Sequence, residues 1–150
     1  MVQVSIDGVI LTPLKKIDNP KGDVYHALKN TDAGYLGFGE TYFSTVKSGE
    51  IKGWKKHKKM TMNLIVPAGK IKIVLYDGRE ESLSKGQFMK ISLSPTNYFR
   101  LTVPPNVCMA FQGIDASLNL LVNIADIPHD PTESENISLA KIDYDWTSVF

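Results

Sequence analysis

The sequence contains one cysteine and almost no net charge, and each shortage excludes a class of protein. The single Cys108 excludes an internal disulfide framework and is typical of a reducing compartment. A net charge of +1 argues against general nucleic-acid binding, because acids elsewhere balance the clustered lysines. No apolar run approaches the roughly 20 residues of a membrane span, and no basic segment precedes the first apolar residues as in a secretory signal. We therefore expect a cytoplasmic protein without nucleic-acid or membrane partners.

The remaining composition is that of a globular protein, with 43% hydrophobic and 22% charged residues, and its length fits a single domain over residues 1–150. Short segments rich in β-branched and aromatic residues recur with Gly, Pro, Asn and Asp between them. This pattern predicts an all-β sandwich or barrel. Strands are expected at Val2–Val4, Val9–Leu11, Glu40–Val46, Met60–Val66, Lys70–Tyr76, Gln87–Leu93, Tyr98–Val103, Val107–Gln112 and Ser117–Ile124.

Turn residues predict that two pairs of these strands form hairpins, and Asp77-Gly78 is another dipeptide typical of a hairpin. Met60–Val66 and Lys70–Tyr76 flank Pro67-Ala68-Gly69, and Val107–Gln112 and Ser117–Ile124 flank a glycine turn. The best helical candidate is Asp23–Asn30, which is short and has no strong periodicity.

A basic cluster gathers around Trp54 and is the strongest functional signal in the chain. It consists of Lys52, Lys55, Lys56, His57, Lys58 and Lys59. Lysines of this kind can simply protect a strand edge from pairing with another sheet. In an extended chain, however, Gly53, Lys55 and His57 share one face, and Trp54 and Lys56 share the other. We expect Lys55 and His57 to point into the barrel.

The middle of the chain has a family-specific spacing, in YDGREESLSKGQFMKISLSPTNYFRLTVPPNVCMAF. It resembles the pattern D-x-R-x-x-S-x-x-x-G, L-S-x-x-N and P-x-x-x-x-x-F of the dTDP-4-dehydrorhamnose 3,5-epimerase family. The matching positions are Asp77, Arg79, Ser82, Gly86, Leu93, Ser94, Asn97, Pro105 and Phe111. The segments KGDVYHALK, IKGW and HDPTESENI are similar to further family segments, so the resemblance covers roughly residues 5–146.

The resemblance implies a cupin-type double-stranded β-helix jelly roll with one short helix and a polar C-terminal tail. It further implies a homodimer that acts on nucleoside diphosphate 4-keto sugars without metal or cofactor. The phosphate-binding arginines of the family correspond to Lys21 and Lys52 here, and a substrate-facing glutamine corresponds to Glu40.

The usual acid and base of that family are absent from their expected positions. The catalytic histidine after L-R-G-L corresponds to Lys55, and a second histidine corresponds to Met109. The tyrosine acid falls near Val122, and the aspartate that pairs with the first histidine is expected to be missing from this shorter C-terminus. The resemblance thus places Met109 in the substrate site. Tyr42, Tyr76 and Tyr98 are each possible acids, and alternation does not say which of them faces inward.

Several readings of these residues stay open. Lys55 is either a replacement base or a third phosphate contact, and His57 is either the base or a rim histidine. No metal site is expected, because metal-binding cupins present H-x-H with a carboxylate and a later histidine. The sequence therefore predicts a nucleotide-sugar epimerase or isomerase with Lys55 and His57 as catalytic residues. The alternative is an inactive epimerase fold that binds a sugar nucleotide or phosphorylated ligand.

Overall fold

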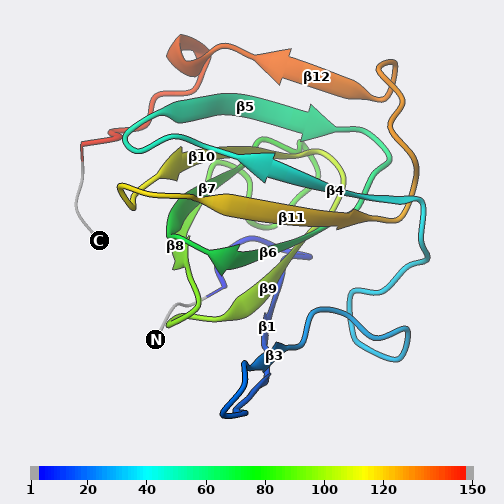
Figure 1. Cartoon of the computed structure of the whole chain (residues 1–150). Helices are drawn as coiled ribbons and strands as arrows, with labels where there is room; N and C mark the ends of the chain where they lie inside the picture. Colours follow the sequence, from blue (N-terminus) through cyan, green and yellow to red (C-terminus); the bar gives the residue numbers. More distant parts are fainter. Residues whose placement is uncertain (1–3, 148–150) are drawn as a thin grey trace.

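The computed structural model describes residues 4–147 and shows two five-stranded sheets packed face to face as a jelly roll (Figure 1). All pairs of named strands are antiparallel. The first sheet has the order β1 (Ile10–Pro13), β9 (Phe99–Val103), β6 (Met62–Ala68), β11 (Leu120–Ala125) and β4 (Glu40–Thr45). The second has the order β12 (Ser134–Ile137), β5 (Ile51–His57), β10 (Val107–Gly113), β7 (Ile71–Asp77) and β8 (Phe88–Leu93). The predicted all-β jelly roll is confirmed.

The core lies between the two sheets, because one face of each strand carries apolar residues. Leu64 and Leu101 from the first sheet and Ile73, Leu75 and Ile91 from the second are almost completely buried there. A fully buried side chain of this kind contributes about 1.5–3 kcal/mol relative to an exposed one. This packing holds both walls of any space between the sheets in fixed positions.

Neither of the two predicted hairpins forms. The chain crosses from β6 in the first sheet to β7 in the second, and again from β10 in the second to β11 in the first. The expectation was wrong because turn residues show where the chain reverses, whereas the sheet that a strand joins depends on distant partners. A hairpin does form after Asp77-Gly78, where β7 pairs with β8 and Ile71 lies opposite Leu93.

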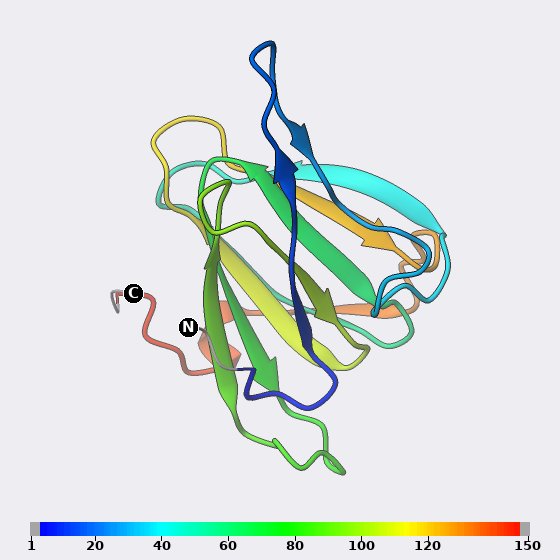
Figure 2. The same ribbon diagram turned by 90° about the horizontal axis from the view of Figure 1, so that it is seen from below.

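The predicted helix at Asp23–Asn30 is also wrong. This segment contains β3 (Val24–Tyr25), which pairs with β2 (Lys16–Ile17) in an arm that projects from the body (Figure 2). The guanidinium of the buried Arg100 donates one hydrogen bond to the carbonyl of Ala27, at 2.7 Å. It also donates to a second carbonyl of this loop, so the loop is fixed from outside instead of by its own helical bonds.

The segment after β12 covers the outer face of the second sheet, and it includes the 3₁₀ helix Leu139–Lys141. Trp146 packs on Trp54 with ring centroids 6.1 Å apart. The ammonium of Lys72 lies 5.0 Å from the ring of Tyr144 and 5.5 Å from the ring of Trp146. These cation–π contacts explain why a residue that alternation assigns to solvent is buried.

The predicted strand Val2–Val4 falls almost wholly outside the described residues, and Val9–Leu11 corresponds to β1. Within residues 4–147, no helix has the length and apolar character needed to cross a membrane.

Candidate active site

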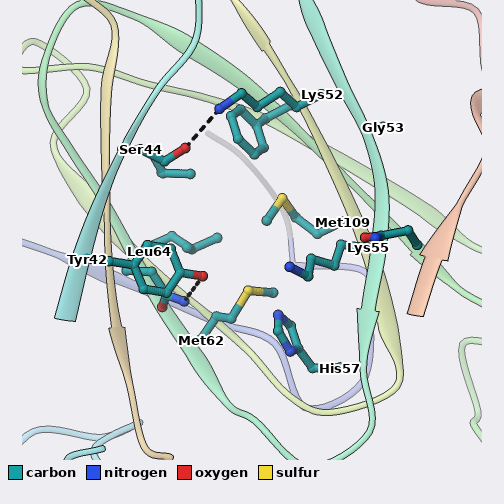
Figure 3. Close-up of a pocket in the computed structure, with 13 residues that line it drawn as sticks. Tyr42, Ser44, Lys52, Gly53, Lys55, His57, Met62, Leu64 and Met109 are labelled. Atoms are coloured by element: carbon teal, nitrogen blue, oxygen red, sulfur yellow. Dashed lines mark hydrogen bonds between the residues drawn. The ribbon is translucent and has the colours of Figure 1, made fainter. Parts of the chain in front are cut away.

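A cavity of about 290 Å³ opens between the two sheets at the end where β4 and β5 lie. Polar groups from both sheets line it, over a surface of apolar side chains (Figure 3). The lining residues are Tyr42, Ser44, Lys52, Gly53, Lys55, His57, Met62, Leu64, Met109, Phe111, Leu121, Asn123 and Asn136. A small apolar pocket with a few convergent polar groups is the usual form of a ligand site.

Strand β5 supplies three of the polar groups, and a β-bulge determines which ones. Lys55 is paired with Met109, but Lys52 is paired with Phe111, so two residues of β5 lie opposite one residue of β10. The extra residue reverses the alternation at this point. Lys52 therefore lines the cavity together with Lys55 and His57, although Trp54 between them is buried on the outer face.

His57 is held by a carboxylate from the distant end of the chain. Its Nδ1 lies 2.5 Å from Oε1 of Glu133, and both side chains are about 2–3% exposed. The carboxylate accepts a hydrogen bond from Nδ1–H, which leaves Nε2 as the nitrogen with the lone pair. Nε2 is buried and has no partner within residues 4–147, and the ring points into the cavity (Figure 3). This is the arrangement of an oriented general base.

Hydrogen bonds favour the ionised form of Glu133. Burial alone would raise its pKa, but the hydrogen bonds from His57 and from the amides of Lys59 and Met60 hold the pKa below its usual value. Glu133 itself is fixed by a turn in which its own amide donates to the carbonyl of Asp130. A charged carboxylate at this position stabilises the imidazolium that forms when His57 takes a proton.

Tyr42 faces His57 across the cavity, from β4 in the other sheet (Figure 3). Its hydroxyl oxygen accepts a hydrogen bond from Nδ2 of Asn123 at 3.0 Å. The amide oxygen of Asn123 in turn accepts from the backbone of Asn63 at 3.2 Å, which fixes the orientation of the amide. No side chain in the described part of the chain accepts the hydroxyl proton of Tyr42, so this proton is available to a ligand.

The structure separates the other tyrosines from the site. Tyr76 stacks on Phe88 on the outer face of the second sheet, and Tyr98 donates a hydrogen bond to the carbonyl of His26. Of the three tyrosines that the sequence left open, only Tyr42 lines the cavity.

The residues that the sequence proposed for the site divide into two groups. Lys52, Lys55, His57 and Met109 line the cavity together. Neither Lys21 nor Glu40 lines the cavity. Lys21 lies between the two strands of the projecting arm.

The sequence analysis did not predict Glu133, because the carboxylate that pairs with the catalytic histidine was expected to be missing from this C-terminus. No local signal marks it, since it is 76 positions from His57. Within residues 4–147, no three His, Cys, Asp or Glu side chains gather as a metal site would require.

Comparison with known proteins shows the family to which the chain belongs. The sequence model of dTDP-4-dehydrorhamnose 3,5-epimerase matches residues 3–149. The spore coat polysaccharide biosynthesis protein SpsL of Bacillus subtilis (strain 168) is 23% identical over 149 residues, which cover 97% of this chain and 99% of SpsL. The probable low-salt glycan biosynthesis epimerase Agl13 of Haloferax volcanii is 24% identical over 106 residues, 70% of this chain and 66% of Agl13.

Solved structures show the same fold. The dTDP sugar isomerase from Desulfovibrio desulfuricans G20 superposes with a TM-score of 0.93 at 35% identity, covering 100% of this chain and 98% of that one. The dTDP-4-dehydrorhamnose 3,5-epimerase from Elizabethkingia anophelis NUHP1 gives 0.83 at 16% identity, covering 99% and 86%. With a family model that matches nearly its whole length, this chain belongs to the dTDP-4-dehydrorhamnose 3,5-epimerase family.

Proposed function

We propose that the protein epimerises a nucleoside diphosphate 4-keto-6-deoxyhexose, of the kind used to build surface polysaccharides or deoxysugars. The observation that carries this proposal is the His57–Glu133 pair, whose free Nε2 faces a cavity in a family of sugar-nucleotide epimerases. The names of relatives support the substrate class, since they include a polysaccharide biosynthesis protein and a dTDP sugar isomerase. The buried thiol of Cys108 fits a cytoplasmic reaction.

The reaction begins with removal of a proton from a carbon next to the C4 ketone. Nε2 of His57 takes this proton, the electron pair of the C–H bond forms a C=C bond, and the carbonyl pair moves onto oxygen to give an enolate. The negative carboxylate of Glu133 stabilises the charged imidazole.

Inversion requires a second proton donor on the opposite face of the sugar ring. Tyr42 is suited to this role because it projects from the first sheet, whereas His57 projects from the second. The amide of Asn123 holds the hydroxyl oxygen while leaving its proton available. Tyr42 donates its hydroxyl proton to the enolate carbon, and the electron pair on oxygen re-forms the C4 carbonyl, which yields the inverted centre. The Tyr42 phenolate then takes up a proton and the His57 imidazolium releases one by exchange with solvent.

We assign the binding of the negative diphosphate to Lys52, which lines the cavity and is exposed. Its ammonium lies 3.1 Å from the hydroxyl of Ser44, which orients it. Lys21 and Glu40 are left out of this assignment because neither lines the cavity.

Hydrogen exchange in deuterium oxide tests the proposal. With dTDP-4-keto-6-deoxyglucose, the wild-type protein should place deuterium at C3 or C5 and invert that centre, as seen by NMR. The Tyr42→Phe variant should still exchange the proton from the His57 face, but it should form the inverted product about 10²-fold more slowly. Tyr76→Phe, which changes a tyrosine on the outer face, is the matched control and should behave as wild type.

A binding protein without catalysis is the second candidate, and Lys55 and Met109 favour it because they occupy positions where the family has histidines. It predicts that the sugar nucleotide binds in calorimetry while no deuterium enters the sugar. That outcome would refute the epimerase assignment and leave the site as a binding site.

We also propose that two copies associate through the outer face of the first sheet. Phe43 points away from the cavity and is 71% exposed, and Val122 beside it is partly buried. Leu36 and Phe38, which precede β4, are exposed as well. An exposed aromatic face of this kind commonly marks an interface.

Sedimentation equilibrium tests the association. Phe43→Glu should convert the homodimer to a monomer, whereas Leu83→Glu, at a 97% exposed leucine in a loop, should leave it dimeric. A wild-type protein that sediments as a monomer would contradict this proposal without affecting the catalytic one.

A further inference from the structure

Lys52 and Lys55 line the same cavity, but they differ in surroundings and in position along β5. Lys52 is exposed, and its ammonium lies near Ser44 and 5.8 Å from the ring centre of Phe111. Lys55 is half-buried and projects between Met109 and His57 (Figure 3). No ion pair within residues 4–147 includes either lysine. Both ammonium groups are therefore available to a ligand, at different depths.

A 4-keto sugar nucleotide presents two separate oxygen sites to such a pair. The diphosphate is attached at C1, and the ketone is at C4, at the opposite end of the pyranose ring. The acidic hydrogens are on C3 and C5, immediately beside the ketone. When His57 reaches one of these hydrogens, the ketone lies next to His57 and the diphosphate lies away from it.

This order along the ring matches the order of the side chains along β5. His57 is followed by Lys55 and then by Lys52, which is the most exposed of the three (Figure 3). Resting on the proposed function, we infer that Lys55 binds the C4 carbonyl oxygen, whereas Lys52 alone binds the diphosphate. Lys55 is then a catalytic residue and not a third phosphate contact.

The charge balance of the step explains why a cation is needed there. When His57 removes the proton, one negative charge develops on the C4 oxygen, while Glu133 and the new imidazolium neutralise each other. The ammonium of Lys55 donates a hydrogen bond to this oxygen and loses no proton. A donor that strengthens its contact as charge develops lowers the barrier, and the apolar side chains of Met62 and Met109 keep water from weakening the contact.

Two matched substitutions separate the roles. Lys52→Gln should weaken the binding of dTDP, which has no ketone, by about tenfold in calorimetry because a charged phosphate contact is lost. Lys55→Gln should leave dTDP affinity within about twofold of wild type, yet slow deuterium exchange at saturating keto sugar by about 10²-fold. Lys56→Gln, on the outer face of the same strand, should change neither quantity.

Infrared difference spectra provide a readout that does not depend on turnover. With dTDP-4-keto-6-deoxyglucose labelled with ¹³C at C4, the carbonyl stretch should fall on binding to wild-type protein and to Lys52→Gln. It should stay near its solution value in Lys55→Gln. A protein that shifts the carbonyl band but exchanges no deuterium would contradict the epimerase function and preserve the assignment of Lys55.

The assignment is overturned by the opposite pattern. If Lys55→Gln loses dTDP affinity as strongly as Lys52→Gln and keeps both the exchange rate and the carbonyl shift, Lys55 is a second diphosphate contact. An unchanged carbonyl stretch in the wild-type complex would also refute it.

Discussion

Two buried carboxylates in this protein accept similar sets of hydrogen bonds, but only one of them has a partner that reaches the cavity. Asp77 accepts hydrogen bonds from Nε of Arg79 at 2.8 Å and from the hydroxyls of Ser82 and Ser84, each at 2.6 Å. Arg79 in turn donates to the carbonyl of Asp7 at 2.6 Å. Glu133 likewise accepts hydrogen bonds from a side chain, the imidazole of His57, and from backbone amides, but His57 keeps its other nitrogen unpaired at a cavity.

We propose that the first network is structural and the second catalytic. Every polar contact of Asp77 ends inside the protein, so the cluster fixes the loop between β7 and β8. The contacts around Glu133 end on Nε2 of His57, which is costly to bury without a partner unless a ligand supplies one. We therefore expect changes at the first cluster to affect folding, and changes at the second to affect activity.

The largest expected effect is loss of the base. His57→Gln should lower kcat for epimerisation by about 10³-fold, because no other side chain in the cavity is oriented to take the proton. The temperature of unfolding should change little, so that the comparison of the two clusters is preserved. His26→Gln, at a histidine outside the cavity, is the control, and equal losses in both variants would remove His57 from the mechanism.

The second expected effect is on folding alone. Asp77→Asn should lower the free energy of unfolding by about 3 kcal/mol, because it removes the charge that Arg79 pairs with and disturbs a filled set of donors. Urea denaturation measures this change. The folded Asp77→Asn variant should keep a near-normal kcat. A large loss of activity in the fully folded variant would contradict the view that this cluster affects folding alone.

Glu133→Gln should come next, because it removes a charge without removing the base. We expect kcat to fall by about 10²-fold with KM nearly unchanged, since a neutral amide stabilises the imidazolium less well. NMR should show that the imidazole proton bound at Nδ1 loses its downfield shift. Glu133→Asp retains the charge and should recover part of the rate; no recovery would point to a purely structural role.

The smallest effect concerns acid. Burial would raise the pKa of Asp77, but hydrogen bonds from Arg79, Ser82 and Ser84 outweigh it and hold the pKa well below its usual value. The pKa of Glu133 is lowered as well. As pH falls below about 4, the unfolded chain takes up protons that the folded protein does not, so stability decreases, for Asp77 by on the order of 1–2 kcal/mol. Asp77→Asn should show a shallower decrease between pH 5 and 3; an identical slope would argue against the lowered pKa.

The local sequence predicted many of the residues that line the cavity, but not the strand register that brings them there. Alternation along an extended chain was enough to place Lys55 and His57 on one face, and both line the cavity. Strict alternation would put Lys52 on the face of Trp54, but the bulge between the Lys55–Met109 and Lys52–Phe111 pairs brings it to the cavity face. Register depends on the partner strand, and alternation within β5 contains no information about it.

The sequence by itself determined that this chain forms short strands, that cations gather beside Trp54, and that the spacing of its motifs is that of one enzyme family. Only the tertiary structure decided which strands pair, which tyrosine enters the cavity and that Glu133 orients His57. The physical reason is the range of the forces involved. Side-chain alternation and turn preference act over a few residues, whereas sheet pairing joins segments that are distant in the chain and are brought together by burial of a common core.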